Sequence, residues 1–547
     1  MKRIIHIMAY AAIIAATVSC VKDLDQYPQT DMTSRDVYKD ADGYQGVLSG
    51  IYAAFIQRIG NVSTESRSQN WIRTMMMFQD ASTDALDAIW LAGESLTDVN
   101  GLSWTAGDPW VSAAYYHIYN IVAMTNELIR NCDESIISGF SEEDKNRIRI
   151  CRDEARFLRA YAYMQAMDFY PKMSFITDND PVGSFQPQTY DRKQMFGFLE
   201  NELKDIAGTL KDVSYGHATS YAAWALLSRL YINGEVWTGQ SYATQCIQAC
   251  KEVLKGGFTL EKDYQKLFNG DNHLRTNEII FAFACDGART TTWDATTFIT
   301  CGSVLSDFDD YDKVHGTTDS GPWDCLRARP DLVNTFTTGD SRACFLSYDR
   351  LLDSLHATRP AGYYTKEGDN LYIYKERSKD IIGHDETTSG WRITKWTNLT
   401  DAGEPASRCS DGGGANTDFP VLRLAEINLN LAEAVLRGGS GASEEDALKS
   451  INDLRARAFG SEGEAISSDE LTLGFILDER LREMYMECIR RTDLIRFGKY
   501  TSGKTWQWKG GTFEGKDTDD RFAFLPIPEA ELSVNPEMKT VNAQLGY

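Results

Sequence analysis

The sequence predicts a mainly α-helical protein, in which helical hairpins of the tetratricopeptide type stack into a superhelix and carry a loop-rich insertion with short strands. Three observations lead to this prediction. The stretch Glu154–Tyr170 has an apolar face too wide for a helix that stands alone in water. Amphipathic segments of helix length recur around it in adjacent pairs. Between residues 271 and 417, short aromatic runs separated by Gly, Asp and Thr replace the helical pattern.

The central helix is expected to end at Pro171, because proline cannot continue a helix. Acidic residues after Ser141 predict its capped start. We interpret Glu154, Arg156 and Arg159 as structural or solvated charges. The face that should meet other helices consists of residues three and four apart: Phe157, Leu158, Tyr161, Ala162, Gln165 and Phe169.

Composition excludes several classes of function. The chain has 547 residues and a net charge of −23, which would repel a phosphate backbone, so no nucleic-acid partner is expected. Its eleven cysteines include no CxxC pair, and its seven histidines lack ligand spacing, so neither a metal site nor a cofactor is predicted. Cys246 and Cys250 are expected to be buried thiols. The acidic run Asp307–Asp312 remains open between a calcium loop and a solvated loop.

The N-terminus has the pattern of an export signal. Lys2 and Arg3 precede the apolar run Ile4–Val18, which is too short to span a bilayer. A small residue followed by Cys20 resembles a bacterial lipoprotein cleavage site. We therefore expect a signal peptide over residues 1–19, lipidation of Cys20 and a tether over residues 20–39. An ordinary signal peptide with an incidental cysteine is the alternative.

Residues 40–270 are predicted to form an N-terminal helical scaffold. Small and aromatic residues in two of its segments are spaced as in tetratricopeptide units, and a second such pair lies near Ala425 and Ala447. The predicted helices are Asp40–Gly60, Asn70–Phe78, Trp110–Ile129, the helix after Ser141, Arg192–Leu210, Ser220–Trp237 and Tyr242–Leu254.

Residues 271–417 are predicted to be a variable insertion that binds the ligand, because loop-rich insertions often carry function. Glu278–Ala284 has the length and composition of a strand, and shorter strand-like pieces follow at Leu371–Tyr374 and Trp391–Trp396. The glycines after Asp411 lack the Lys-Ser/Thr of a phosphate loop, which favours a flexible connection.

Residues 418–547 complete the predicted scaffold and contain ordered motifs. Opposite charges recur every three or four residues at Arg480, Glu483, Glu487, Arg490 and Asp493, which predicts paired contacts that lock a helix to its neighbours. An enzyme would instead use Glu479 and Glu483 as an acid/base pair. The motifs, in order, read DFPVLRLAEINLNLAEA, ALKSINDLRARA, ILDERLREMYMECIRRTDLIRFGK, FLPIPEAELSVNP and NAQLGY.

These motifs, with LDQYPQ after Cys20 and EARFLRAYAY in the central helix, resemble the SusD/RagB family of Bacteroidetes outer-membrane lipoproteins. Cys488 stands where the family usually has glycine. The resemblance implies a tetratricopeptide-like helical fold and a surface receptor, not an enzyme. Such a receptor binds oligosaccharide and delivers it to a SusC-like TonB-dependent transporter of the outer membrane. A peptide receptor on the same scaffold, a glycoside hydrolase and a pure scaffold protein are the alternatives.

Aromatic residues in loop-like sequence are the candidates for stacking on sugar rings. Trp110, Trp224 and Trp237 lie in helical motifs and are expected in the core. By resemblance, the ligand site is formed by loops after the first helices and by the insertion near residues 290–330. The candidate aromatic residues in these regions are Trp90, Trp104, Trp293, Trp323 and Tyr311, and the candidate hydroxyl acceptors are Asp84, Asp307 and Asp324.

Overall fold

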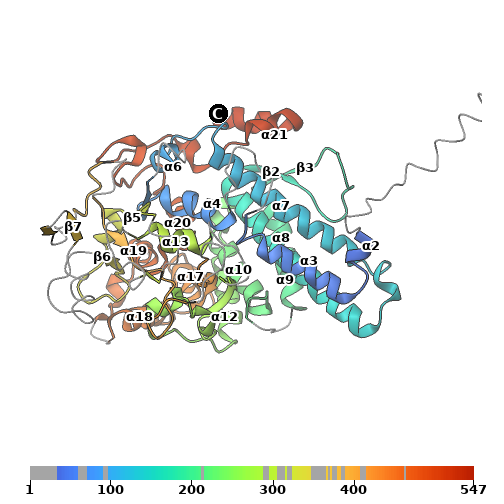
Figure 1. Ribbon diagram of the computed structural model, residues 1–547, viewed down its shortest axis with the longest axis horizontal. Helices are drawn as coiled ribbons and strands as arrows, with labels where there is room; N and C mark the ends of the chain where they lie inside the picture. Colours follow the sequence, from blue (N-terminus) through green and yellow to red (C-terminus); the bar gives the residue numbers. More distant parts are fainter. Residues whose placement is uncertain are drawn as a thin grey trace, which may run out of the picture.

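The computed structural model describes the chain in segments (Figure 1). They are residues 34–58, 70–89, 96–210, 215–287, 295–304, 315–316, 323–346, 365–367, 370–372, 378–383, 389–406, 414–460 and 464–547. The predicted signal peptide, Cys20 and most of the predicted tether lie outside these segments. No helix in the described segments is long and apolar enough to cross a membrane.

The described structure is mainly helical, as predicted, and the helices fall into three groups along the chain. Before the insertion the helices are α2 (Ser34–Val37), α3 (Ala41–Ala53), α4 (Trp71–Met76), α6 (Thr97–Gly101), α7 (Pro109–Asn131), α8 (Glu142–Phe169), α9 (Arg192–Ala207), α10 (Ser220–Ile232), α11 (Gly234–Thr238) and α12 (Ala243–Leu254). The insertion contains α13 (Thr296–Gly302) and α15 (Pro330–Val333). The C-terminal helices are α17 (Leu424–Leu436), α18 (Glu444–Phe459), α19 (Leu473–Met484), α20 (Arg490–Arg496), α21 (Glu529–Val534) and α22 (Glu537–Leu545).

Short helical turns join these elements. One is a π-helical turn, η1 (Met77–Ala81), which continues α4 where the sequence pattern is ambiguous. The others are the 3₁₀ turns η2 (Ile137–Gly139), η3 (Tyr264–Phe268), η4 (Asn272–Leu274), η6 (Ser468–Glu470), η7 (Lys509–Gly511) and η8 (Asp520–Ala523).

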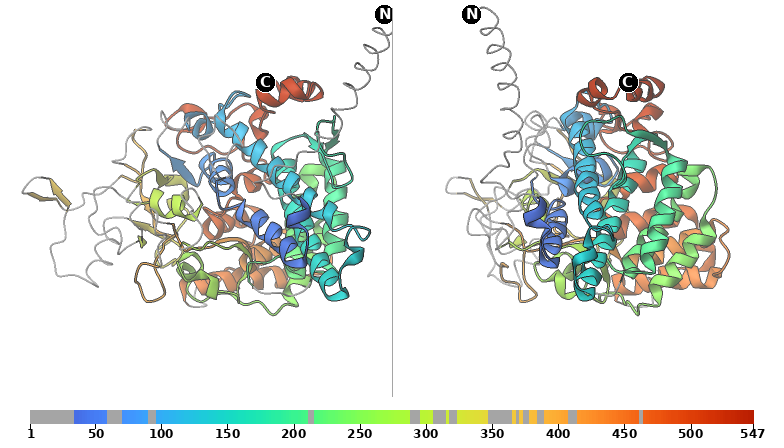
Figure 2. Two further views of the ribbon diagram at one scale, coloured as in Figure 1. Left: turned by 45° about the vertical axis from the view of Figure 1, so that its right-hand side comes forward. Right: turned by 90° about the vertical axis from the view of Figure 1, so that its right-hand side faces the viewer.

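The long helices stack in sequence order. α3 and α7 pack on α8, α8 packs on α9, α9 on α10, α10 on α12 and α12 on α17. α17 then contacts both α18 and α19, so the C-terminal hairpins extend the same stack. Figure 1 shows α3, α7, α8 and α9 side by side, and Figure 2 shows the long helices running along one another. The predicted superhelical hairpin scaffold is thus present.

The central helix α8 begins and ends as the sequence indicates. The Ser141 hydroxyl accepts a hydrogen bond from the backbone N–H of Asp144 at 3.1 Å, and the helix stops at Phe169, before Pro171. The predicted apolar face is buried. The charges on α8 bond to neighbouring elements: Glu154 accepts from Tyr52 at 2.6 Å, and Arg159 pairs with Asp178 at 2.7 Å. They are therefore structural, as interpreted from the sequence.

All described strands are short and form antiparallel pairs. β4 (Ile279–Phe283) pairs with β10 (Phe419–Arg423), and both strands are fully buried. Because β4 lies near the start of the insertion and β10 directly follows its end, this pair joins the two ends of the insertion to the core. The other pairs are β1 (Leu86–Ala88) with β5 (Leu326–Ala328), β2 (Lys172–Phe175) with β3 (Gln188–Asp191), β6 (Phe345–Leu346) with β9 (Arg392–Ile393), and β7 (Thr365–Glu367) with β8 (Asn370–Tyr372).

One apolar core runs from Ala41 to Val541 and therefore includes residues of the scaffold, the insertion and the C-terminal region. Trp110 and Trp237 are buried in it, and Trp224 is half-buried against it. Cys246 and Cys250 are buried free thiols, as predicted. The proposed boundaries between the three regions remain a prediction.

Cys488 lies in the loop between α19 and α20 and has a φ of +61°, in the left-handed region that favours glycine. The neighbouring Met486 has a φ of +58°. The carboxylate of Asp80 accepts hydrogen bonds from the backbone N–H groups of Met486 at 3.1 Å and Cys488 at 2.9 Å. This buried carboxylate on η1 holds the loop in its unusual conformation.

Candidate functional site

The candidate site is at one end of the β1–β5 pair, in which Ala88 lies opposite Leu326. The next residue along β1, Ile89, donates its backbone N–H to the carbonyl of Cys325 at 2.7 Å. Trp323, two residues before Cys325, donates its backbone N–H to the carbonyl of Cys301 at the end of α13, at 3.0 Å. Ile89, which directly precedes the candidate Trp90, and the candidate Trp323 thus lie near α13. The third candidate tryptophan, Trp293, precedes this helix by three residues in the chain.

Trp323 is the one predicted sugar-stacking residue that the described structure places at a partly accessible position. It is half-buried, and its ring centroid lies 6.2 Å from that of Phe298 on α13. The guanidinium of Arg73 on α4 lies over the Phe298 ring, 4.3 Å from its centroid. The same guanidinium lies 5.5 Å from the ring centroid of Trp110. A cation over an aromatic face is attracted by the ring quadrupole, so this buried contact supports the Phe298 ring beside Trp323 from within the protein.

Arg73 and Phe298 were not singled out from the sequence. The sequence around Arg73 indicates a short helix and nothing more, and Phe298 is surrounded by threonines. The residue that fixes Arg73 is Asn70, whose side-chain oxygen accepts the backbone N–H of Arg73 at 2.9 Å. Asn70 also donates its side-chain amide to the carbonyl of Ile56 at 2.8 Å. An N-cap asparagine before Arg73 was the only local signal of this arrangement.

The two cysteines near Trp323, Cys301 and Cys325, are not nucleophiles. Burial raises the pKa of the Cys301 thiol to about 12 and that of the Cys325 thiol to about 12. Because the thiolate is the reactive form, both thiols are inert at neutral pH.

Asp324 follows Trp323 but points into the protein. Its carboxylate forms an ion pair with the guanidinium of Arg392, which also donates to the carbonyl of Leu326 at 3.2 Å. Asp324 is buried and has a φ of +51°. We therefore withdraw it as an acceptor for sugar hydroxyls, because its charge is used to join the end of β5 to β9.

Trp104 and Asp84 are also withdrawn from the predicted site. Trp104 is 1% exposed, and its indole N–H donates to the Tyr547 hydroxyl at 2.9 Å and to the Phe524 carbonyl at 3.2 Å. Its loop-like sequence context gave no sign that the C-terminus covers it.

Asp84 is fully buried, and its two carboxylate oxygens each lie 2.7 Å from a guanidinium nitrogen of Arg490. The ammonium of Lys504 is 2.7 Å from one of the same oxygens. Burial would raise the pKa of Asp84, but these two cations outweigh it and hold the pKa well below its usual range.

The remaining predicted residues, Trp90, Trp293, Tyr311 and Asp307, lie outside the described segments, as does the acidic run that contains Asp307. Within the described segments, no group of three or more His, Cys, Asp or Glu side chains has the arrangement of a metal site.

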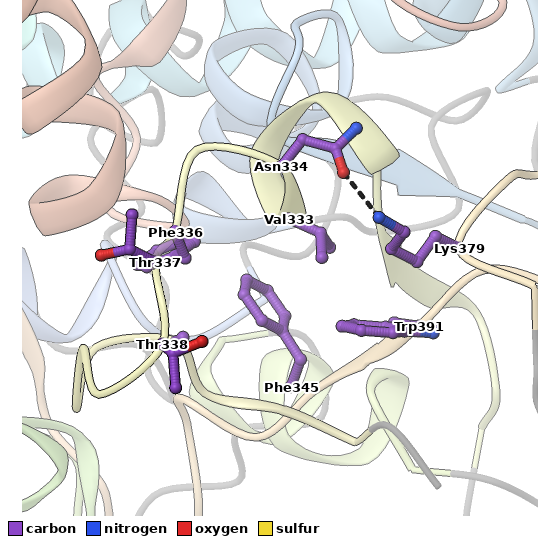
Figure 3. Close-up of a pocket in the computed structure, with 9 residues that line it drawn as sticks. Val333, Asn334, Phe336, Thr337, Thr338, Phe345, Lys379 and Trp391 are labelled. Atoms are coloured by element: carbon purple, nitrogen blue, oxygen red, sulfur yellow. Dashed lines mark hydrogen bonds between the residues drawn. The ribbon is translucent and has the colours of Figure 1, made fainter. Parts of the chain in front are cut away.

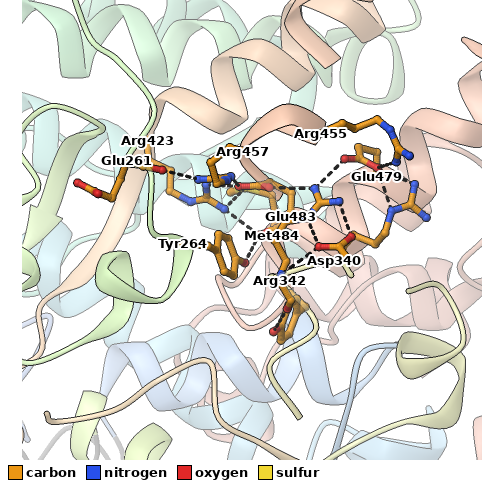
Figure 4. Close-up of polar contacts among 12 residues, drawn as sticks. Glu261, Tyr264, Asp340, Arg342, Arg423, Arg455, Arg457, Glu479, Glu483 and Met484 are labelled. Carbon is orange, nitrogen blue, oxygen red and sulfur yellow. Dashed lines mark hydrogen bonds and ion pairs between the residues drawn. The ribbon is translucent and has the colours of Figure 1, made fainter. Parts of the chain in front are cut away.

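The alternative acid/base pair, Glu479 and Glu483, belongs to a buried ion network (Figure 4). Arg342 lies 2.7 Å from Glu479 and 3.1 Å from Glu483, and Arg423 lies 2.6 Å from Glu483. Although burial opposes ionisation, the guanidinium groups of Arg457, Arg423 and Arg342 hold the pKa of Glu483 well below its usual range. A general acid needs a raised pKa and access to substrate, so this pair is not catalytic.

The same network contains the paired contacts predicted for the charge ladder, but the ladder does not lie on one helix: Glu487 is in the loop between α19 and α20, and Arg490 and Asp493 are on α20. Glu487 accepts from the ammonium of Lys395 at 2.6 Å and lies 2.7 Å from Arg423. Arg480 pairs with Asp493 at 2.9 Å, which joins α19 to α20. These contacts link the C-terminal helices to β10 and to the insertion.

Comparison with known proteins shows what this architecture resembles. Starch-binding protein SusD of Bacteroides thetaiotaomicron is 26% identical, over 98% of this chain and 98% of that protein. SusD-like protein P25 of Formosa agariphila is 23% identical, over 98% of this chain and 97% of that protein.

Among solved structures, surface glycan-binding protein A of Bacteroides thetaiotaomicron, in complex with laminarihexaose, superposes with a TM-score of 0.68 at 17% identity. The match covers 90% of this chain and 97% of that one, and it shows a shared fold. Residues 277–547 match the SusD family, and together with the near full-length similarity to SusD this makes the protein a member of the SusD family.

Proposed function

We propose that this protein is a lipid-anchored receptor at the cell surface that binds an oligosaccharide and delivers it to a SusC-like TonB-dependent transporter. As a member of the SusD family it is a binding protein and not an enzyme. The relatives support the class of ligand, since one is named a starch-binding protein and another was solved with laminarihexaose.

The observation that carries the proposal is the half-buried Trp323, held beside Phe298 and Arg73 where the described ends of two candidate segments meet at α13. A flat aromatic ring matches the C–H face of a sugar. Trp90 directly follows Ile89 in the chain, and Trp293 precedes α13 by three residues. The proposed site therefore consists of Trp90, Trp293 and Trp323, with Tyr311 and Asp307 as further candidates.

Isothermal calorimetry with maltohexaose and laminarihexaose tests this site. Replacing Trp323 by Ala should weaken binding by roughly 1–3 kcal/mol, the size of one aromatic stacking contact. Trp90→Ala and Trp293→Ala are expected to act in the same direction. Trp224→Ala is the matched control, since Trp224 is also half-buried but lies on α10. If all three site variants stay folded and bind like the wild type, the site is placed wrongly.

The same titrations should include a mixture of short peptides, because a peptide receptor would use the same scaffold. Delivery is tested by purification from native membranes, where we expect a SusC-like transporter to co-purify. The net charge of −23 predicts that salt weakens part of that contact. Recovery of the protein without any such transporter would argue against delivery.

A further inference from the structure

An aromatic hollow lies in the insertion, away from Trp323. It has a volume of about 320 Å³, and its lining includes Asn334, Phe336, Phe345, Lys379, Trp391 and the two threonines Thr337 and Thr338 (Figure 3). This volume is at the lower end of the range for small-molecule sites and suits one or two sugar rings.

This hollow and the proposed oligosaccharide site lie at opposite ends of β5. The backbone N–H of Ala328, at the C-terminal end of β5, donates to the carbonyl of Trp391 at 2.8 Å. Trp323 lies beyond the other end of the strand and bonds to α13. Trp323 and Ala328 are five positions apart, at most about 17 Å in an extended chain, and the lining of the hollow includes neither Trp323 nor Phe298, so the two aromatic sites are distinct.

The walls of the hollow are aromatic and rigid. The Phe345 ring is buried, with its centroid 6.5 Å from that of Trp391 and 5.4 Å from that of Phe336. Phe345 is itself stacked at 5.8 Å on the buried ring of Tyr485, which fixes it from below. Trp391 and Phe336 are half-buried and so keep part of their surface accessible.

A cation and a carboxamide stand at the rim. The exposed ammonium of Lys379 donates to the side-chain oxygen of Asn334 at 2.7 Å and lies 6.0 Å from the Trp391 ring centroid. Figure 3 shows the Lys379 side chain between those of Asn334 and Trp391. Asp380 follows Lys379 in the chain, but its carboxylate accepts a hydrogen bond from the side-chain amide of Gln507 at 3.0 Å.

Some lysines of the fold have a carboxylate partner, whereas the ammonium of Lys379 donates to a carboxamide. Lys395 pairs with Glu487 at 2.6 Å and Lys504 with Asp84 at 2.7 Å. Among the described residues, no carboxylate forms an ion pair with Lys379. The protein as a whole is acidic, but salt screens its long-range repulsion within about 8 Å, so the charge nearest to a bound ligand decides.

We propose that this hollow is a second carbohydrate site, which binds a sugar ring bearing an anionic group. Trp391 takes the C–H face of the ring, Asn334 and the threonines take hydroxyl groups, and Lys379 takes the anion, which is a carboxylate or a sulfate. The inference rests on the proposed function only for the class of ligand, since the residues differ completely from those of the Trp323 site.

Calorimetry with three tetrasaccharides tests the proposal: tetragalacturonic acid, its fully methyl-esterified form, and a sulfated galactose tetrasaccharide. We expect at least one anionic tetrasaccharide to bind the wild type about tenfold more tightly than the neutral ester. Lys379→Met should remove that difference and leave the weak binding of the ester unchanged. Lys379 is exposed, so this variant should fold normally.

Trp391→Ala should weaken every tetrasaccharide that binds here by about tenfold. Because Trp391 is half-buried, Trp391→Phe serves as a variant that keeps an aromatic ring, and partial retention of binding is expected. Trp323→Ala and Trp224→Ala are the matched controls and should leave the anionic ligand unaffected.

The proposal is overturned if neither anionic tetrasaccharide binds at millimolar concentration, or if the Lys379→Met protein binds them as the wild type does. These outcomes are separate from those of the Trp323 site. Neutral glycans that bind through Trp323, with anionic ones unaffected by Trp391, would remove the second site alone. If anionic glycans need Trp391 and neither maltohexaose nor laminarihexaose binds, only the first site is removed.

Discussion

Replacing Asp84 by Asn should destabilise the protein strongly while leaving glycan binding unchanged. Asp84 is fully buried, and both of its oxygens lie 2.7 Å from Arg490. The substitution keeps the shape of the side chain but removes the charge of the carboxylate that forms the bidentate pair with the buried guanidinium of Arg490. Breaking a buried pair in this way costs about 3–5 kcal/mol.

Lys504→Met is the control, because it removes the other cation near Asp84 but leaves the bidentate contact with Arg490. Lys504 is 25% exposed, so its pair is partly solvated and should contribute less than about 1 kcal/mol. The double variant Asp84→Leu with Arg490→Met should cost less than Asp84→Asn alone, because no buried charge is then left unpaired.

Urea unfolding followed by tryptophan fluorescence at pH 7 measures these differences, and calorimetry with the glycan measures affinity on the folded variants. The pH dependence adds a check. Because the folded pKa of Asp84 is depressed, its contribution is present above the unfolded pKa of about 3.9 and is lost as the pH falls below it. The wild type should therefore lose more stability than Asp84→Asn between pH 5 and pH 3. A variant with native stability but lost glycan affinity would refute the reasoning and return Asp84 to the ligand site.

Three further predictions follow from other residues. Trp104→Ala should lower the free energy of unfolding by about 3–5 kcal/mol in urea titrations, because it empties a buried site, and should not change the glycan affinity of the folded fraction. Burial raises the pKa of Asp418 to about 7, so the folded state holds its proton more tightly than the unfolded state, and stability should fall as the pH rises from about 4 to 7. Asp418→Asn should flatten that part of a pH series of unfolding curves, and an unchanged slope would contradict the assignment. Cys20→Ala should release the protein from washed outer membranes in a fractionation assay, whereas its retention there would disprove the lipid anchor.

The helices were predictable because their signals are local. The spacing of apolar residues gave α7 as Trp110–Ile129, against Pro109–Asn131 in the structure, and Ser141 caps α8 as expected. The strand at Glu278–Ala284 is β4. The sequence predicted no element over Asp80–Asn100, where the strand β1 is only three residues long and pairs with the distant β5.

The candidate site was predictable only in part, because loop-like sequence does not reveal burial. Trp323 and Trp104 have similar polar surroundings in the sequence, yet one is half-buried beside Phe298 and the other is covered by the C-terminal residue Tyr547. The hollow at Trp391 was missed because Lys379 and Asn334 meet there only after folding.

By itself, the sequence determined the helical hairpins, the export signal pattern and the family motifs, since each depends on residues a few positions apart. Only the tertiary structure decided which tryptophans reach the surface and which charged side chains form ion pairs in the core. Asp84 and Arg490 are 406 residues apart and carry no local sign of their pairing. Long-range contacts of this kind arise from the packing of whole elements. Which polar residues remain available to bind a ligand therefore depends on which of them pair in the core, and the tertiary structure decides this.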